Sequence, residues 1–331
     1  MSEEVKQSSD VLLSVRDLEV VYTSAGAVIH AVNGVSLELK RGESLGLVGE
    51  TGAGKTTIAK SIMGILPDPP AKVRRGEILL DGKDLLKLSE KEMRSIRGKK
   101  ISMIFQDPMT ALNPLMTVGD QIAEVVSLHE KCSKKEAMNK AMEMLEMVGI
   151  PAERYSEFPH QFSGGMKQRV VIAIALACNP ELLLADEPTT ALDVTIQAQV
   201  MEMIAELQKK LNTAMILITH DLGIVAETCD RVAVIYAGEI VELASKQDLF
   251  LHPTHPYTIG LFGSIPSLSE DVDRLTPIPG LPANPEKLPQ GCHFNPRCTH
   301  CTQQCRQAEV PFVEVSPNHF VRCHLCAGKA E

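Results

Sequence analysis

Short runs of hydrophobic residues alternate along the chain with segments whose apolar residues recur at helical spacing. Four of these runs are mostly apolar, without polar alternation, and predict buried strands at 44–48, 101–105, 182–185 and 214–219. Strands that are apolar on both faces are typical of a mostly parallel sheet covered by helices. The pattern therefore predicts an α/β fold.

A strongly helical segment lies between the second and third of these runs. Ser133 and Glu136 have the spacing of a capping box, and Gly149 is placed to end the helix. Apolar residues recur at helical spacing between them: Met138, Ala141, Met142, Leu145 and Val148. We expect a helical insert over about 107–162, and we interpret its methionines as ordinary packing.

The composition changes after about residue 250. Nine of the 20 prolines fall between Pro253 and Pro296, which predicts an extended connection along the surface. Six of the nine cysteines follow between Cys292 and Cys326. We therefore expect one domain over 1–250 and an extension over 251–331, with a cysteine-rich, metal-binding part at about 290–326.

Composition and charge restrict the function. The chain has 331 residues, of which 44% are hydrophobic and 23% charged, so a folded protein is expected rather than a disordered one. A net charge of −9 argues against binding to a nucleic-acid duplex. The first ten residues show no secretory signal, and the most apolar stretch, 170–178, is about half the ~18 residues that a spanning helix needs. Any role at a membrane is therefore expected to require a partner.

The most specific motif is GETGAGKT at residues 49–56, a complete G-x-x-x-x-G-K-[ST] sequence. It follows a buried strand and precedes a helical pattern at 57–65, where backbone N–H groups and the helix dipole favour phosphate. Lys55 is expected to contact the β- and γ-phosphates, and the Thr56 hydroxyl to bind Mg²⁺. The motif predicts ATP binding.

A second element fits nucleotide hydrolysis. The buried run 182–185 is followed directly by Asp186 and Glu187. At the end of a strand, Asp186 can hold the Mg²⁺ shell while Glu187 polarises the attacking water.

The clustered cysteines leave two metal schemes open. Cys298 with Cys301, and Cys323 with Cys326, form CxxC pairs at about the separation seen in a zinc ribbon. Four thiolates from the same segment can equally hold an iron–sulfur cluster. Without an export signal, a metal site fits better than a disulfide framework.

The segment FSGGMKQR at residues 162–169 resembles the signature sequence of ABC-type ATPases. Other elements of that family are present along the chain in the family's order. They are Tyr22 as the adenine-stacking aromatic, Gln106 as the Q-loop glutamine, Ala191 to Asp193 as the D-loop, and His220 as the switch histidine. The resemblance covers roughly residues 11–245. The signature reads FSGGM where LSGGQ is commonest, but its serine and both glycines are kept, so an active half-site is expected.

This resemblance implies a P-loop ATPase core with an antiparallel β subdomain and a helical insert. It also implies that two such domains close head to tail on two ATP, with Ser163, Gly164 and Gly165 of one covering the γ-phosphate held by the other. Glu187 would be the general base, His220 would orient the γ-phosphate and water, and Gln106 would bind Mg²⁺ and communicate with the insert, where a membrane partner docks. The remaining nucleotide contacts implied are Tyr22, Gly49, Glu50, Thr51, Gly52, Ala53, Gly54, Lys55, Thr56, Thr57, Asp186 and Asp193, with Thr56 and Asp186 also on Mg²⁺.

The tail is similar to the C-terminal extension of the ABC ATPases of dipeptide and oligopeptide importers. The segments HPYT at 255–258, GCHFNPRC at 291–298 and VRCH at 321–324 carry that resemblance. In that family the recurring set corresponds to Cys292, Cys298, Cys305 and Cys323, and members have been linked to a [4Fe–4S] cluster. Cys301 and Cys326 fall outside the set and keep Zn²⁺ as the alternative. We expect the cluster, with the plain role of stapling the tail.

The resemblance implies the ATP-hydrolysing subunit of a peptide importer, peripheral on the cytoplasmic face of the cell membrane. Its expected partners are two permease subunits, a second, related ATPase chain in a heterodimer, and an extracytoplasmic substrate-binding protein, with no nucleic acid. One alternative is a nickel-chelate or oligosaccharide importer, because those systems share the extension. Another is a soluble ABC ATPase acting on nucleic acid or ribosomes, which the single P-loop and short insert disfavour.

Overall fold

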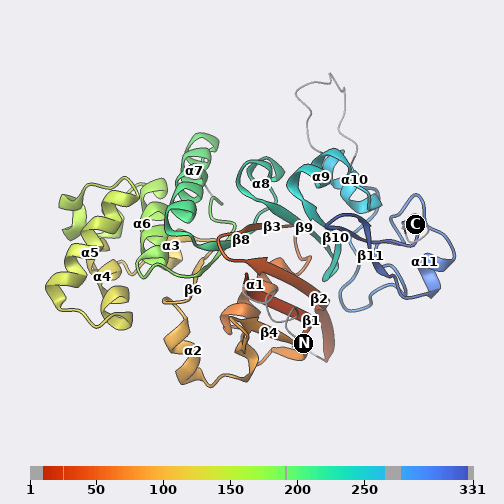
Figure 1. Cartoon of the computed structure of the whole chain (residues 1–331), viewed down its shortest axis with the longest axis horizontal. Coiled ribbons are helices and arrows are strands. Elements are labelled where there is room, and N and C mark those ends of the chain that lie inside the picture. Colours follow the sequence, from red (N-terminus) through yellow and green to blue (C-terminus); the bar gives the residue numbers. More distant parts are fainter. Residues whose placement is uncertain (1–9, 25, 191, 265–276, 327–331) are drawn as a thin grey trace, which may run out of the picture. The chain divides into compact units, whose positions relative to one another are not determined.

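The computed structural model describes residues 10–24, 26–190, 192–264 and 277–326, which form two compact units (Figure 1). Unit 1 comprises Met1–Leu13, Leu39–Ser44 and Leu80–Thr228, and unit 2 comprises Ser14–Glu38, Leu45–Leu79 and Cys229–Glu331. The chain therefore passes between the units several times. Among the described residues, no helix has both the length and the apolarity to cross a bilayer.

Unit 1 is built on three parallel strands in the order β8-β7-β6, with bounds Ala214–Ile218, Leu182–Asp186 and Ile101–Ile104. Every residue in them is buried, as expected for strands covered on both faces. The hydrophobic runs thus predicted the strands within one or two residues. The longer helices α6 (Gly164–Leu176) and α7 (Val194–Leu211) and the short α8 (Leu222–Thr228) belong to the same unit.

The helical insert in unit 1 contains α3 (Pro108–Ala111), α4 (Val118–His129) and α5 (Lys134–Met147). The Ser133 side chain accepts from the Glu136 N–H, and the Glu136 carboxylate accepts from the Ser133 N–H, so the expected capping box is present. The face of α5 that packs in the insert is fully buried at Ala141, Met144 and Leu145. The short α2 (Glu90–Ile96) lies earlier in the unit.

Unit 2 contains most of the antiparallel sheet β2-β1-β4, whose strands are Ala27–Lys40, Val11–Ser24 and Ala71–Leu80. It also contains β3 (Ser44–Val48), which pairs in parallel with β9 (Arg231–Tyr236). Next to β9 follow β10 (Glu239–Ser245), β12 (His319–Arg322) and β11 (Phe312–Ser316), all antiparallel. The last two strands come from the cysteine-rich tail, so the tail extends the sheet of the nucleotide-binding part.

The proline-rich stretch is not extended throughout, contrary to the sequence prediction. Helix α10 (Pro256–Phe262) forms inside it, after α9 (Lys246–Leu251). Pro256 stands at the first helical position, where no backbone N–H is needed, and His255 Nδ1 accepts from the Tyr257 N–H at 3.0 Å. Most of residues 277–303 lack regular structure, before α11 (Gln304–Gln307).

A buried carboxylate joins β10 to the tail. Glu242 is fully buried and accepts from the backbone N–H groups of Thr254 and His255 at 2.8 and 2.9 Å. His319 Nε2, on β12, lies 2.7 Å from the same carboxylate. A buried charge is tolerated only when it is fully paired, and Glu242 has a partner for each oxygen.

We predict that Glu242→Ala lowers the free energy of unfolding by about 3–5 kcal/mol, because it leaves two backbone N–H groups and His319 without their acceptor. Denaturant unfolding followed by circular dichroism measures this change. Glu314→Ala is the control, since Glu314 is an exposed glutamate of β11 that accepts a single backbone hydrogen bond from Asn318. Equal losses in the two variants would contradict the assigned role of Glu242.

Candidate functional site

The glycine-rich loop of unit 2 connects β3 to helix α1 (Lys55–Met63). Gly49, Gly52 and Gly54 have φ values of 151°, 82° and 103°, a region that favours glycine. A Cβ added to Gly49 would lie 2.1 Å from the Ile235 carbonyl oxygen, and one added to Gly54 would lie 2.3 Å from that of Ala31. Two of the three glycines are therefore required for space as well as for conformation.

The Lys55 ammonium lies within this loop. Its side chain is 7% exposed overall, and Nζ donates to the carbonyl oxygens of Gly49 and Glu50 at 2.7 and 3.0 Å. A cation thus stands at the N-terminus of α1, where the helix dipole also favours an anion. The predicted phosphate-binding residues are together in this part of unit 2.

Tyr22, predicted to stack on adenine, lies on β1 in the same unit. Its side chain is half-buried, and its hydroxyl lies 3.4 Å from the Thr57 Oγ1 in the first turn of α1. Residues Glu50 to Ala53 of the loop also line a cavity of about 170 Å³, together with His30, Tyr236, Ala237, Pro282, Ala283 and Pro285. The proline-rich stretch therefore forms one wall of a hollow beside the loop.

The predicted catalytic residues of unit 1 meet at Glu187. Its carboxylate accepts from Gln106 Nε2 at 2.8 Å and lies 3.4 Å from His220 Nδ1. Sequence reasoning missed Thr190, whose hydroxyl donates to the same carboxylate at 3.0 Å. The signal for Thr190 was available, because it follows Glu187 by three residues and one tight turn brings such positions together.

The backbone at Glu187 is constrained as well. Its φ is +46°, uncommon for a residue with a side chain, and its N–H donates to the Ile218 carbonyl oxygen at 2.8 Å. Such conformations concentrate at functional sites. Asp186 precedes it at the end of β7 and is 4% exposed. The oxygens of Asp186 and Thr56 are the hard donors that Mg²⁺ prefers.

The signature segment places its small residues at the N-terminus of α6. Ser163 accepts from the Met166 N–H at 3.4 Å as the cap, and Gly164 and Gly165 open the helix. Ser163 and Gly164 are exposed. A Cβ on Gly165 would lie 2.7 Å from the Ile196 side chain, so that glycine is needed for packing.

Asp193 has a visible structural role. It caps α7, with its carboxylate accepting from the Ile196 N–H at 3.1 Å. Ala191, the first residue of the predicted D-loop, lies outside the described residues.

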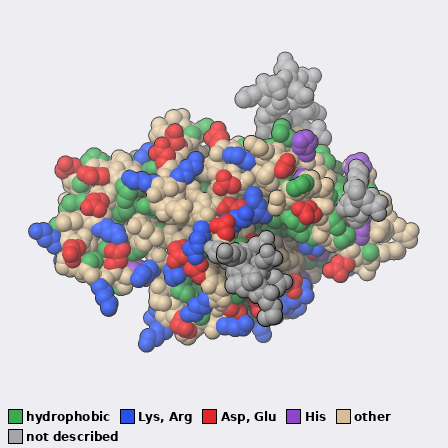
Figure 2. All heavy atoms as spheres, viewed as in Figure 1, with side chains coloured by type: hydrophobic (Ala, Val, Ile, Leu, Met, Phe, Trp, Pro, Cys, Tyr) green, Lys and Arg blue, Asp and Glu red, His purple; other side chains and the backbone are tan. Residues whose placement is uncertain are grey.

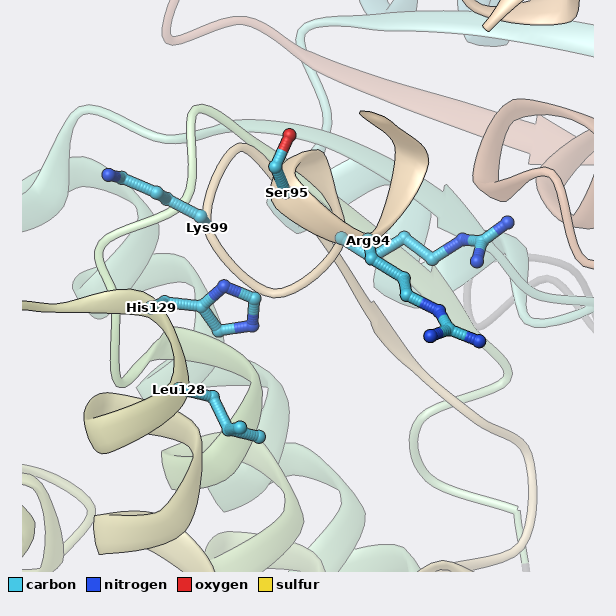
Figure 3. A pocket seen from close by; sticks show the side chains of 6 residues that line it. Arg94, Ser95, Lys99, Leu128 and His129 are labelled. Atoms are coloured by element: carbon cyan, nitrogen blue, oxygen red, sulfur yellow. The ribbon is translucent and has the colours of Figure 1, made fainter. Parts of the chain in front are cut away.

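Unit 1 also contains a hollow lined mainly by basic side chains (Figure 3), which the sequence did not predict. It has a volume of about 540 Å³ and is lined by residues of α2, the following turn and the end of α4: Arg94, Ser95, Arg97, Lys99, Leu128 and His129. Burial, and then the charge of Lys99, lower the pKa of His129. Arg94 and Arg97 both pair with Glu90, which offsets part of the positive charge.

The thiols of the predicted cluster set influence one another. Burial, and then the charges of Cys323, Cys305 and Cys298, raise the pKa of the Cys292 thiol to about 12. The Cys292 N–H also donates to the Cys305 carbonyl oxygen at 2.9 Å. Cys301 also raises the pKa of the Cys298 thiol, after burial and Cys323, and its own thiol accepts from Arg306 Nε at 3.4 Å and contacts the Thr302 carbonyl at 3.5 Å.

Within the described residues, no three His, Cys, Asp or Glu side chains are arranged to hold a single metal ion. The predicted metal site is therefore not seen as a formed site in this part of the chain, and the thiols supply only the donor type that an iron–sulfur cluster takes.

Comparison with known proteins agrees with these observations. A model described as ABC transporter matches residues 32–190, and one described as the C-terminal region of oligopeptide/dipeptide transporters matches residues 241–305. The dipeptide transport ATP-binding protein DppD of Bacillus subtilis is 52% identical over 97% of this chain and 96% of its own length. The oligopeptide transport ATP-binding protein OppD of the same organism is 53% identical over 95% of this chain and 88% of its own.

Solved structures show the same cassette fold. A dimeric ATP-binding cassette in a post-hydrolysis state, bound to ADP and Pi, is 28% identical, with a TM-score of 0.64 over 71% of this chain and 99% of that one. The cbiO1 protein of Clostridium perfringens, part of the ABC transporter complex cbiONQ, is 30% identical, with a TM-score of 0.63 over 74% of this chain and 92% of its own. The expected α/β cassette fold is confirmed, and the chain belongs to the ABC transporter family, among the ATP-binding proteins that carry the oligopeptide/dipeptide transporter C-terminal region.

Proposed function

We propose that this chain binds and hydrolyses ATP to power the import of dipeptides or oligopeptides, as a peripheral subunit on the cytoplasmic face of the cell membrane. The observation that carries the proposal is identity of about half the residues with DppD and OppD of Bacillus subtilis over nearly the whole chain, tail included. The complete phosphate loop and the hydrogen-bonded Glu187 support an active enzyme.

ATP is held by its phosphates in the loop of unit 2. Backbone N–H groups from Gly52 to Thr57 take the phosphate oxygens, and Lys55 exchanges its two carbonyl partners for the β- and γ-phosphates. Tyr22 provides the aromatic face for adenine. Thr56, Asp186 and Gln106 would hold Mg²⁺, which neutralises charge that develops on the phosphate oxygens.

Hydrolysis depends on Glu187 as the general base. Its carboxylate takes a proton from water, the water oxygen bonds to the γ-phosphorus, and the bond from that phosphorus to the β–γ bridging oxygen breaks to leave ADP and phosphate. Gln106, Thr190 and His220 fix the direction of the carboxylate in the described structure. His220, which is 75% exposed, is free to turn toward the γ-phosphate.

The exposed signature segment supports a head-to-tail dimer. Ser163, Gly164 and Gly165 present the N-terminus of a 13-residue helix to a γ-phosphate on a second ATPase chain. The similarity of this chain to a dimeric cassette bound to ADP and Pi supports this arrangement. We propose a related but different chain as the second subunit, with Asp193 at the dimer-facing D-loop.

Two permease subunits and an extracytoplasmic binding protein complete the proposed transporter. The helical insert is the docking side for the permeases, with Leu115 and Leu128 as its most exposed large apolar residues. Acidic and basic side chains are interspersed over the face shown in Figure 2, and the net charge is −9, which agrees with partners other than nucleic acid. Import of nickel chelates or oligosaccharides by the same machinery is the alternative.

We further propose that Cys292, Cys298, Cys305 and Cys323 hold a [4Fe–4S] cluster that staples the tail. The influence of Cys323, Cys305 and Cys298 on the pKa of the Cys292 thiol supports this set. The alternative is Zn²⁺ bound by the two CxxC pairs, which include Cys301 and Cys326.

Glu187→Gln should lower the rate of ATP hydrolysis by about 10²–10⁴-fold while ATP still binds, because the amide cannot accept the proton. Phosphate release and a nucleotide-binding titration on the same preparation measure the two effects. Glu143→Gln, a change at an exposed glutamate of α5, is the matched control. Hydrolysis by Glu187→Gln at the control's rate would refute the assigned base.

The transported substrate can be tested with the chain purified together with its permease subunits and placed in lipid vesicles. We expect ATP-dependent uptake of labelled di- or oligopeptides in the presence of the binding protein, and none with Glu187→Gln. Uptake of a nickel chelate or an oligosaccharide in place of peptide would select the alternative importer. If no membrane proteins purify with the chain, the importer proposal is wrong.

For the metal, we expect about four iron and four sulfide per chain, with visible absorption, in anaerobically purified protein. Cys305→Ser should lose the metal, whereas Cys301→Ser should keep it. The reverse pattern, with zinc and no colour in the parent protein, would move the ligands to the CxxC pairs.

A further inference from the structure

The phosphate loop is held by an arginine of the cysteine-rich segment. Arg297 Nη1 donates to Glu50 Oε2 at 2.8 Å, and Nη2 donates to Oε1 at 3.0 Å, so the planar guanidinium grips both carboxylate oxygens. Glu50 is the second residue of the loop. The Arg297 side chain is 5% exposed and that of Glu50 is 26% exposed, so water competes little for this pair.

The backbone of Glu50 has a second contact with the extension. Its N–H donates to the Tyr257 hydroxyl at 2.9 Å, and Tyr257, on α10, is among the largest fully buried side chains. Both the side chain and the main chain of one loop residue are therefore fixed by residues that lie more than 200 positions later in the sequence.

Arg297 is itself held in place before it reaches Glu50. Its Nε donates to the Pro279 carbonyl oxygen at 3.0 Å, and its guanidinium carbon lies 5.8 Å from the ring centres of both Tyr236 and Phe294. A long side chain fixed by so many contacts has already lost its rotamer freedom. It can therefore restrain its partner without a further entropic cost.

The segment that carries Arg297 is the first part of the cysteine-rich fold. The backbone N–H groups of Arg297 and Cys298 both donate to the Phe294 carbonyl oxygen at 3.0 Å. An overlapping turn begins at Cys292, whose carbonyl oxygen accepts from the Asn295 N–H at 2.9 Å. The Cys292 N–H donates in turn to the Cys305 carbonyl oxygen. The position of the guanidinium thus follows from the fold of the tail.

We propose that Arg297 is a positioning residue for nucleotide binding: through Glu50 it holds the phosphate loop in its ATP-binding shape, so the C-terminal extension sets the affinity of the chain for nucleotide. This inference rests on the proposed function of the loop as the ATP phosphate site. Arg297 acts by raising the fraction of molecules whose loop is ready to bind, and the apparent dissociation constant is inversely proportional to that fraction.

Arg297→Gln in the full-length chain tests the proposal. We expect the Kd for Mg-ATP, measured by calorimetry, to rise by about three- to tenfold, as it does when a third to a tenth of the loops remain competent. Arg297→Lys should recover part of the affinity, because one ammonium cannot grip both oxygens. The Kd for Mg-ADP should rise as well, because the proposed effect is on nucleotide binding and not on hydrolysis.

Arg322→Gln is the matched control. Arg322 belongs to the same extension, donates to the carbonyl oxygens of Ile240 and Val310 at 3.2 Å, and lies over the Phe312 ring. None of these three partners belongs to the phosphate loop. It reports what a loss of tail packing alone does to nucleotide affinity and to the thermal midpoint.

Three outcomes decide between the proposals. If Arg297→Gln lowers the thermal midpoint but leaves the Kd as in Arg322→Gln, the role is only structural and the inference is overturned. If Arg297→Gln raises the Kd by the same factor in a Glu50→Gln background, the effect does not pass through Glu50, which also overturns it. If Lys55→Ala leaves the Kd for Mg-ATP unchanged, the phosphate loop is not the ATP site, and the proposed function itself has failed.

Discussion

Two glycines of the phosphate loop have no room for even one additional carbon atom. A Cβ at Gly49 would lie 2.1 Å from the Ile235 carbonyl oxygen, and one at Gly54 would lie 2.3 Å from that of Ala31, both far closer than van der Waals contact allows. A backbone oxygen cannot move away as a flexible side chain can. The shape of the loop is therefore tied to strands β9 and β2, and the start of α1 is tied to the loop.

This constraint explains why the C-terminal extension is part of the ATP-binding unit. Strand β9 is the neighbour of β10, and β10 pairs with β12 of the tail, with Glu242 opposite Val321. The buried Glu242 carboxylate then fixes His255, which caps the helix that carries Tyr257. A continuous set of main-chain and buried polar contacts thus runs from the tail to the phosphate loop.

The sequence was informative wherever the controlling interactions are local. Mostly apolar runs predicted the strands, the Ser133–Glu136 spacing predicted a capping box, and the loop motif carries its own backbone requirements. The motifs also predicted that Glu187, Gln106 and His220 would belong to one site, and their side chains meet in unit 1. Thr190 was missed although its spacing from Glu187 fits a turn, because threonines are common in turns and such a spacing alone does not indicate a catalytic contact.

What the sequence could not predict depends on contacts between distant segments. The strands Phe312–Ser316 and His319–Arg322 are short and only partly apolar. Their place in the sheet is decided by the edge that β10 offers to β12, on which β11 then pairs. The Glu50–Arg297 pair joins positions 247 residues apart, and a glutamate in a phosphate loop gives no sign of its partner. The proline-rich stretch concealed α10, because proline opposes a helix in its interior but not at its first position.

A group bound by the cysteines, as proposed above, would act on the same contacts. Cys292 and Cys298 stand at the two ends of the turn that carries Arg297, and Cys323 directly follows β12, the strand that joins the tail to the sheet. A group bound by these three thiolates and Cys305 would close the turn against the sheet and so hold the guanidinium over Glu50. A staple of the tail would then also support the phosphate loop. Its loss would lower nucleotide affinity as well as the stability of the extension.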